Sequence, residues 1–319
     1  RISQNRVVQQ VCESASTPAL RVLSRVNRAQ IHMTNNSRHN GKTVSLVLGS
    51  GGARGLAHIG VIRWLEEHGY EIRSVAGCSM GALVGGVYAA GRLDEFIHWV
   101  TAVRAIDMVS LLDISLDRNG LVRGDKIIDT LKMLIGDCLI EELGIRFTAV
   151  AADIQNEREV WLDQGPLFDA IRASISLPLF FTPVQDTRGT LIDGGVLNPV
   201  TIAPTFGERT DLTIDVNLDG AQDLYEVVAT SKRTEESGDP TNNLSYFETK
   251  ANEWIRKLLT TKARPRRNAD EWGYYDVVQK AFESMQGTIA RQKLAAYPPD
   301  ILIEIASNQC SILEFDRAE

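Results

Sequence analysis

The chain has 319 residues, enough for one large domain, and its 44% hydrophobic and 24% charged residues are ordinary for a soluble globular protein. Its 41 acidic and 34 basic side chains give a net charge of −7. This charge argues against nucleic acid as the main partner, because duplex binding needs a basic face that neutralises phosphates.

The four cysteines show no Cys-x-x-Cys or Cys/His spacing. This arrangement argues against a disulfide framework and a zinc site, so we expect no metal, no cofactor and a cytoplasmic location, which allows peripheral contact with a membrane. No uncharged apolar run reaches the ~20 residues that span a bilayer. The sequence shows no signal peptide and starts at Arg1, so we interpret it as a piece of a longer protein.

The first predicted element is a helix within the polar and basic residues 1–43, which we interpret as an N-terminal linker or helical extension. Its apolar stripe is formed by Leu20, Leu23, Val26 and Ile31. A helix that docks on the protein and a helix that lies on a membrane surface are both compatible with this pattern.

The next part of the chain repeats the order strand, glycine turn, helix. The segments are a strand at 44–48, a loop at 49–55, a helix at 56–68, a strand at 71–76, a turn at 77–81 and a helix at 82–90. This alternation is typical of a parallel α/β sheet.

Further strands and helices follow and complete one predicted domain over residues 44–319. They are a helical stretch at 92–136, strands at 147–152, 160–162, 190–192 and 212–218, a helix from Pro166 to Ser176, an exposed loop at 232–245, helices at 246–260 and 272–293, and a strand at 300–305. We expect the core at about 44–220 and a mainly helical C-terminal part at 221–319.

The turn Gly77-Cys78-Ser79-Met80-Gly81 fits the pattern G-x-S-x-G. A nucleophile has to project from a sharp turn between strand and helix, where large flanking side chains would collide. We therefore predict that Ser79 is a nucleophile, with a plain structural turn as the alternative. Cys78 is expected to be a small buried residue behind the turn.

The glycine-rich loop 49–55 predicts a set of backbone N–H donors. Successive glycines let amides point at a small anion, such as the oxyanion formed when an ester is attacked. We assign this role to Gly51, Gly52, Ala53 and Arg54. The spacing does not fit a dinucleotide loop, and no Gly-Lys-Ser/Thr follows. The Arg54 side chain would hold the loop, meet an anionic head group or form a simple structural ion pair.

The base that activates Ser79 cannot be a histidine placed as in α/β-hydrolases. There the histidine follows the acid, whereas no histidine of this chain lies beyond His98. His58 and His68 flank one predicted helix and are expected at the surface or as caps. Asp193, at a strand end before Gly194-Gly195, is the candidate base. The alternatives are a simple Asp-Gly turn, or a histidine in a missing C-terminal part.

These three motifs, in this order, closely resemble the patatin-like phospholipase family, in particular its bacterial and neuropathy-target-esterase branch. Leu121–Lys126 and Ser174–Pro178 also resemble segments of that branch, and the likeness spans about residues 43–220. The resemblance implies a three-layer α/β fold with a mostly parallel central sheet flanked by helices. One departure is Ser50, where the loop often carries a glycine.

The resemblance also implies an activity, namely hydrolysis of lipid acyl esters of the phospholipase A or lysophospholipase type. Ser79 matches the nucleophile of the family, Asp193 its partner in a dyad, and the amides of Gly51 to Arg54 its oxyanion hole. The alternative function is a non-catalytic lipid- or nucleotide-binding regulator on the same fold. The basic cluster Lys262–Arg267 is either a solvated loop or a contact to anionic lipid head groups.

Overall fold

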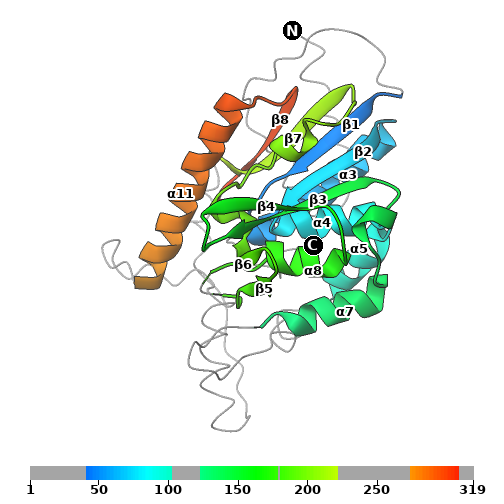
Figure 1. Ribbon diagram of the computed structural model, residues 1–319. Coiled ribbons are helices and arrows are strands. Elements are labelled where there is room, and N and C mark those ends of the chain that lie inside the picture. Colours follow the sequence, from blue (N-terminus) through cyan, green and yellow to red (C-terminus); the bar gives the residue numbers. More distant parts are fainter. Residues whose placement is uncertain (1–40, 103–122, 179, 222–273, 309–319) are drawn as a thin grey trace, which may run out of the picture.

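The computed structural model describes residues 41–102, 123–178, 180–221 and 274–308. These residues form an α/β fold with one central β-sheet and helices on both of its faces (Figure 1). The sheet contains eight strands in the order β5-β6-β3-β2-β1-β7-β8, with β4 paired to β3. The predicted fold class, a mostly parallel sheet flanked by helices, is confirmed.

Five strands form the parallel part of the sheet: β1 (Thr43–Leu48), β2 (Glu71–Cys78), β3 (Arg146–Asp153), β7 (Leu212–Gly220) and β8 (Ile301–Ala306). Three more pair antiparallel: β4 (Arg158–Leu162), β5 (Val184–Asp186) and β6 (Gly189–Asp193). The antiparallel strands all lie on the β3 side, so the direction of pairing changes beside the predicted site.

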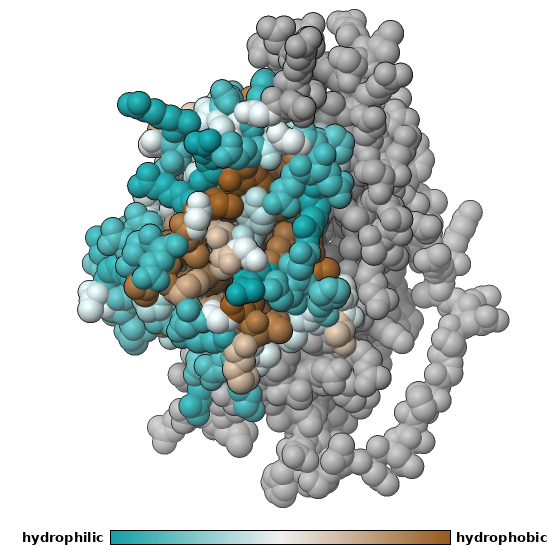
Figure 2. All heavy atoms as spheres, turned by 90° about the vertical axis from the view of Figure 1, so that its right-hand side faces the viewer, coloured by the Kyte–Doolittle hydropathy of each residue, from teal (hydrophilic) through white to brown (hydrophobic). Residues whose placement is uncertain are grey.

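Most helices pack against one face of the sheet. They are α3 (Ala57–Glu67), α4 (Met80–Ala89), α5 (Leu93–Ala102), α7 (Asp125–Ile135) and α8 (Leu167–Ser174). Alternate residues of the central strands, such as Leu46, Leu48 and Val216, join them in the main apolar core. On the side of α5 and α7, Figure 2 shows apolar side chains gathered within a hydrophilic border. Met133 and Leu134 of α7 are exposed apolar side chains.

The opposite face of the sheet is covered by the long helix α11 (Tyr274–Ala296), which stands alone beside β7 and β8 in Figure 1. A second, smaller apolar cluster lies under it and contains Val47, Val200, Ile202, Ala290 and Leu294. The C-terminal part of the chain therefore supplies both an edge strand and the cover of one face.

The predicted elements that fall on described residues are present, with ends shifted by a few positions. Within the predicted helical stretch at 92–136, the described parts form two helices, α5 and α7, and residues 103–122 lie outside the described ranges. Pro166 precedes α8 as its N-cap and is not its first residue. The short strand β5 was not expected. Four expectations lie outside the described residues: the N-terminal helix, the loop at 232–245, the helix at 246–260 and the basic cluster at 262–267. No helix in the described ranges is long and apolar enough to cross a membrane.

Candidate active site

Ser79 lies at the sharp turn between β2 and α4. Its backbone has φ 55° and ψ −126°, a conformation that costs a non-glycine residue free energy and is concentrated at functional sites. The following helix turns back so closely that a Cβ at Gly81 would overlap the carbonyl oxygen of Leu48. The chain therefore forms the tight turn that the G-x-S-x-G pattern predicts, and it leaves Ser79 partly exposed.

The pairing of β3 brings Asp193 next to Ser79. Strand β3 has three partners, yet a strand has only two edges. Since β4 overlaps both β2 and β6 along β3, strands β2 and β6 must share the other edge, one after the other. The last pair of β2 joins Cys78 to Val150, and the next residue of β3, Ala151, pairs with Asp193. Asp193 thus occupies the position that Ser79 would take if β2 continued.

The carboxyl group of Asp193 is fully buried. Burial raises its pKa from 3.8 to about 6, while the Ser79 hydroxyl and the Gly195 amide act in the opposite direction as hydrogen-bond donors. Oδ1 accepts from the Gly195 N–H at 2.8 Å. Among the described residues, Oδ2 has no close hydrogen-bond partner. Catalytic hydrogen bonds commonly tighten only when substrate is bound.

Two serines of the segment Ser174–Ser176 hold the backbones of both residues. The Ser174 hydroxyl accepts from the Ser79 N–H at 3.0 Å and donates to the Val150 carbonyl at 2.6 Å. The Ser176 carbonyl accepts from the Asp193 N–H at 2.9 Å. The sequence identifies this segment only by its resemblance to the family. The hydrogen bonds show what it does in the structure, which is to hold the backbones of Ser79 and Asp193.

The glycine-rich loop packs against the turn that carries Ser79. Residues Gly52–Leu56 form a short 3-10 helix, η2, and a Cβ at Gly55 would overlap the Met80 side chain. The first amides of a helix have no acceptor within it. In the described part of the chain, no backbone oxygen outside η2 accepts from the amides of Gly51, Gly52 or Ala53. Within the described ranges, these N–H groups thus have no backbone acceptor outside the short helix.

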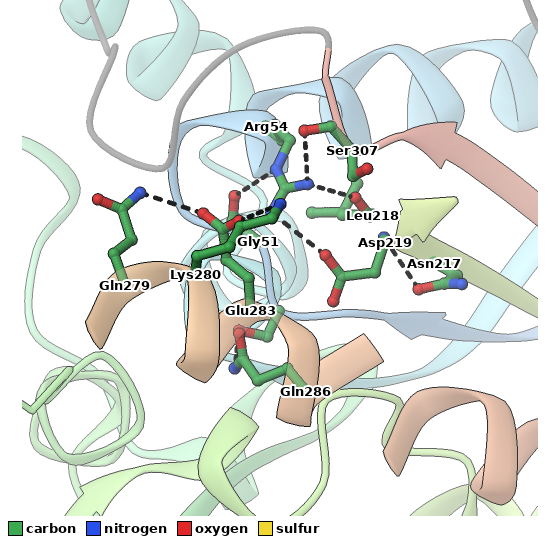
Figure 3. A network of polar contacts seen from close by, with 11 residues as sticks. Gly51, Arg54, Asn217, Leu218, Asp219, Gln279, Lys280, Glu283, Gln286 and Ser307 are labelled. Atoms are coloured by element: carbon green, nitrogen blue, oxygen red, sulfur yellow. Dashed lines mark hydrogen bonds and ion pairs between the residues drawn. The ribbon is translucent and has the colours of Figure 1, made fainter. Parts of the chain in front are cut away.

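The Arg54 side chain is buried and holds the loop (Figure 3). Its guanidinium donates to the carbonyls of Leu218 and Ser307 at 3.0 and 3.1 Å and to that of Gly51 at 3.3 Å, and it pairs with Asp219 at 3.3 Å. Of the three roles expected for this side chain, the structure therefore supports two, holding the loop and forming a structural ion pair, since the guanidinium is occupied by the protein itself.

The expectation that His58 lies at the surface or caps a helix is wrong, because His58 is fully buried. Its Nε2 lies 2.9 Å from the Gly49 carbonyl, and burial lowers its pKa from 6.5 to about 4. The ring is therefore neutral at physiological pH and donates this hydrogen bond, which helps to hold the start of the loop. His68 does have the expected capping role, with Nδ1 2.8 Å from the Trp64 carbonyl.

Cys78 lies behind the turn, as expected. It is fully buried, and its thiol donates to the carbonyls of Asn198 and Pro199 at 3.3 and 3.6 Å. Burial raises the pKa of this thiol well above its usual value, so it stays protonated. Across the described ranges, no group of three or more His, Cys, Asp or Glu side chains is arranged to hold a metal ion.

The comparison with known proteins identifies the class to which this fold and site belong. Residues 46–205 match the patatin-like phospholipase family. An uncharacterized NTE family protein of Mycobacterium tuberculosis is 39% identical over 312 residues, which covers 86% of this chain and 87% of the relative. The chain therefore belongs to the patatin-like phospholipase family, as its motifs predict.

More distant relatives match a shorter part of the chain. Patatin-like phospholipase domain-containing protein 6 of Homo sapiens is 32% identical over 193 residues, 58% of this chain and 14% of that protein. Lysophospholipase nte1 of Emericella nidulans is 33% identical over 186 residues, 55% of this chain and 12% of that protein. Among solved structures, VipD from Legionella pneumophila matches with a TM-score of 0.37 and 16% identity, over 60% of this chain and 52% of VipD.

Proposed function

We propose that this protein is a serine hydrolase of lipid acyl esters in which Asp193 activates Ser79. The observation that carries the proposal is the position of Asp193 on the edge of β3, directly after the last pair of β2 and therefore in line with Ser79. A second support is the Asp193 pKa of about 6, because a general base works best when its pKa lies near the operating pH.

In the proposed first step, Ser79 Oγ attacks the ester carbonyl as its proton passes to Asp193. The carbonyl oxygen gains a negative charge, which the free amides of Gly51 to Ala53 at the start of η2 stabilise; losing one such donor typically costs ~2.7–4 kcal/mol. The Arg54 amide completes the predicted set. The alcohol part of the lipid then leaves with the proton from Asp193, and Ser79 carries the acyl group.

In the second step a water molecule gives its proton to Asp193 and attacks the acyl ester. The fatty acid leaves, and the proton returns to Ser79. The substrate class we propose is a phospholipid or lysophospholipid, since a fungal relative is named a lysophospholipase and the family is described as patatin-like phospholipases. Access to such substrates implies contact with a membrane or micelle surface, and residues 44–319 would act as one hydrolase domain.

The test is hydrolysis of a p-nitrophenyl ester and of lysophosphatidylcholine by the purified protein beside Ser79→Ala. We expect the substitution to lower the rate at least ~10³-fold, because Ser79 is the only group in the scheme that forms the acyl-enzyme. Circular dichroism checks that the fold survives. Equal turnover of both substrates by the two proteins would refute the proposal and favour a binding role for the fold.

A further inference from the structure

Helix α11 lies outside the residues that match the family, yet one of its side chains reaches the candidate site. Gln286 is only 5% exposed. Its Nε2 lies 3.5 Å from the hydroxyl oxygen of Ser50, at the long end of the hydrogen-bond range. Ser50 belongs to the glycine-rich loop, so Gln286 meets this loop directly through a side chain.

A third group meets Gln286 and Ser50 at the same point. A Cβ at Gly195 would lie 2.5 Å from the Gln286 Nε2 and 2.6 Å from the Ser50 Oγ, so any larger residue there would displace these side chains. The Gly195 N–H in turn donates to Asp193 Oδ1 at 2.8 Å. The Gln286 amide therefore lies against both the glycine-rich loop and the turn that carries the acid.

The position of Gln286 is set by the packing of its helix. Residues 286, 290 and 294 follow the four-residue spacing of one helix face, and Ala290 and Leu294 pack in the second apolar cluster. On the same side, Lys293 forms a 2.6 Å ion pair with Glu159 of β4. These contacts hold the Gln286 face of α11 against the sheet.

One turn before Gln286, the same helix approaches the Arg54–Asp219 ion pair, which holds the glycine-rich loop. Glu283 accepts from Lys280 at 3.0 Å and from Gln279 at 3.1 Å (Figure 3). The charges of Glu283 and Lys280 act in opposite directions on the pKa of Asp219, which is the ion-pair partner of Arg54. Helix α11 thus adjoins the loop at two points, Ser50 and the Arg54–Asp219 pair.

We propose that Gln286 is a positioning residue that sets the distance between the glycine-rich loop and the Asp193 turn. The inference rests on the proposed function, because it concerns the alignment of the oxyanion donors with Ser79 and Asp193. Gln286 touches neither reacting group. Without Gln286 the site would still assemble, but the loop amides would no longer be aligned with the oxyanion that forms in the reaction.

The experiment compares kcat and KM for p-nitrophenyl butyrate in Gln286→Ala, Ser50→Ala and the double variant. We expect each single variant to lose roughly 3- to 10-fold in kcat, the range that one hydrogen bond contributes, with KM unchanged. The double variant should lose no more than the larger single loss, because both changes remove the same contact. Gln286→Met, which keeps the volume of the side chain, replaces Gln286→Ala if the latter does not fold.

The matched control is Gln279→Ala, which removes a glutamine of the same helix whose bond is to Glu283 of that helix. It should keep kcat within about 2-fold of the wild type, as expected for a partly exposed intrahelical contact. Provided that the wild type is active, three outcomes would overturn the inference. They are additive losses of kcat in the double variant, a change in KM alone, and no change in either constant. An inactive wild type would instead count against the proposed function.

Discussion

Two buried aspartates of this protein differ in what surrounds them. Asp193 ends β6 and Asp215 lies in the middle of β7, and both are fully buried. Asp193 has the Gly195 amide and the Ser79 hydroxyl as donors, and its pKa rises only to about 6. Among the described residues, neither carboxyl oxygen of Asp215 has a close hydrogen-bond partner, and the Val216 amide is the weakest of the three influences on its pKa. Its burial, together with the charge of Glu304, raises its pKa well above the usual value.

The comparison shows that burial alone does not make a carboxylate useful as a base. Where donors compensate little for burial, the charged form of a carboxyl group is disfavoured and its pKa rises. Donors that stabilise the charged form bring the pKa back toward neutrality, as at Asp193. The contrast therefore predicts that the two residues respond differently to the same substitution.

The largest expected effect is on activity. Asp193→Asn should lower kcat/KM for ester hydrolysis at least ~10³-fold, because the amide cannot take the Ser79 proton. Asp215→Asn should leave kcat/KM within about 3-fold, since no step of the scheme uses this side chain and the carboxyl and amide groups are close in size. Comparable losses in the two variants would remove the distinction between them.

The second effect concerns stability. A pKa raised from 3.8 to about 6 means that the folded state holds the Asp193 proton more tightly than the unfolded chain. The resulting penalty is absent below pH 4, grows as the pH rises to about 6 and is complete above it. Asp193→Asn removes it, so the free energy of unfolding at pH 8 should increase by about 3 kcal/mol.

Urea unfolding at pH 4 and pH 8 measures this difference. The gain should be present at pH 8 and close to zero at pH 4. A gain of equal size at both values would mean that titration of Asp193 is not its cause. A loss at pH 8 would mean that the charged carboxylate stabilises the fold.

A smaller effect is expected at Ser174, which holds the Ser79 backbone. Ser174→Ala leaves the Ser79 N–H and the Val150 carbonyl without this partner, which costs ~1–3 kcal/mol. Because this contact holds the Ser79 backbone, its removal should also displace the nucleophile, so kcat should drop about 10-fold with little change in KM. Ser284→Ala, whose hydroxyl bonds within α11, is the control and should keep wild-type kcat.

Much of the fold could be predicted from the sequence, because the strand, turn and helix segments from 43 to 90 carry their own periodicity and glycines. The sequence also identified Ser79 and Asp193 as candidates, since a serine and an aspartate beside paired glycines are recognisable locally. It could not show that β2 and β6 share one edge of β3, because register between distant strands leaves no local pattern. The contacts of His58 and Gln286 escaped prediction for the same reason, since both depend on tertiary packing.

The most direct test of the central claim is the rate at which a fluorophosphonate labels Ser79 as the pH changes, measured by mass spectrometry of the labelled peptide. If Asp193 activates Ser79, the wild-type rate should rise with pH around an apparent pKa near 6, and Asp193→Asn should lose both the rise and most of the rate. Labelling of Ser79 in Asp193→Asn at the wild-type rate and with the wild-type pH profile would contradict the account.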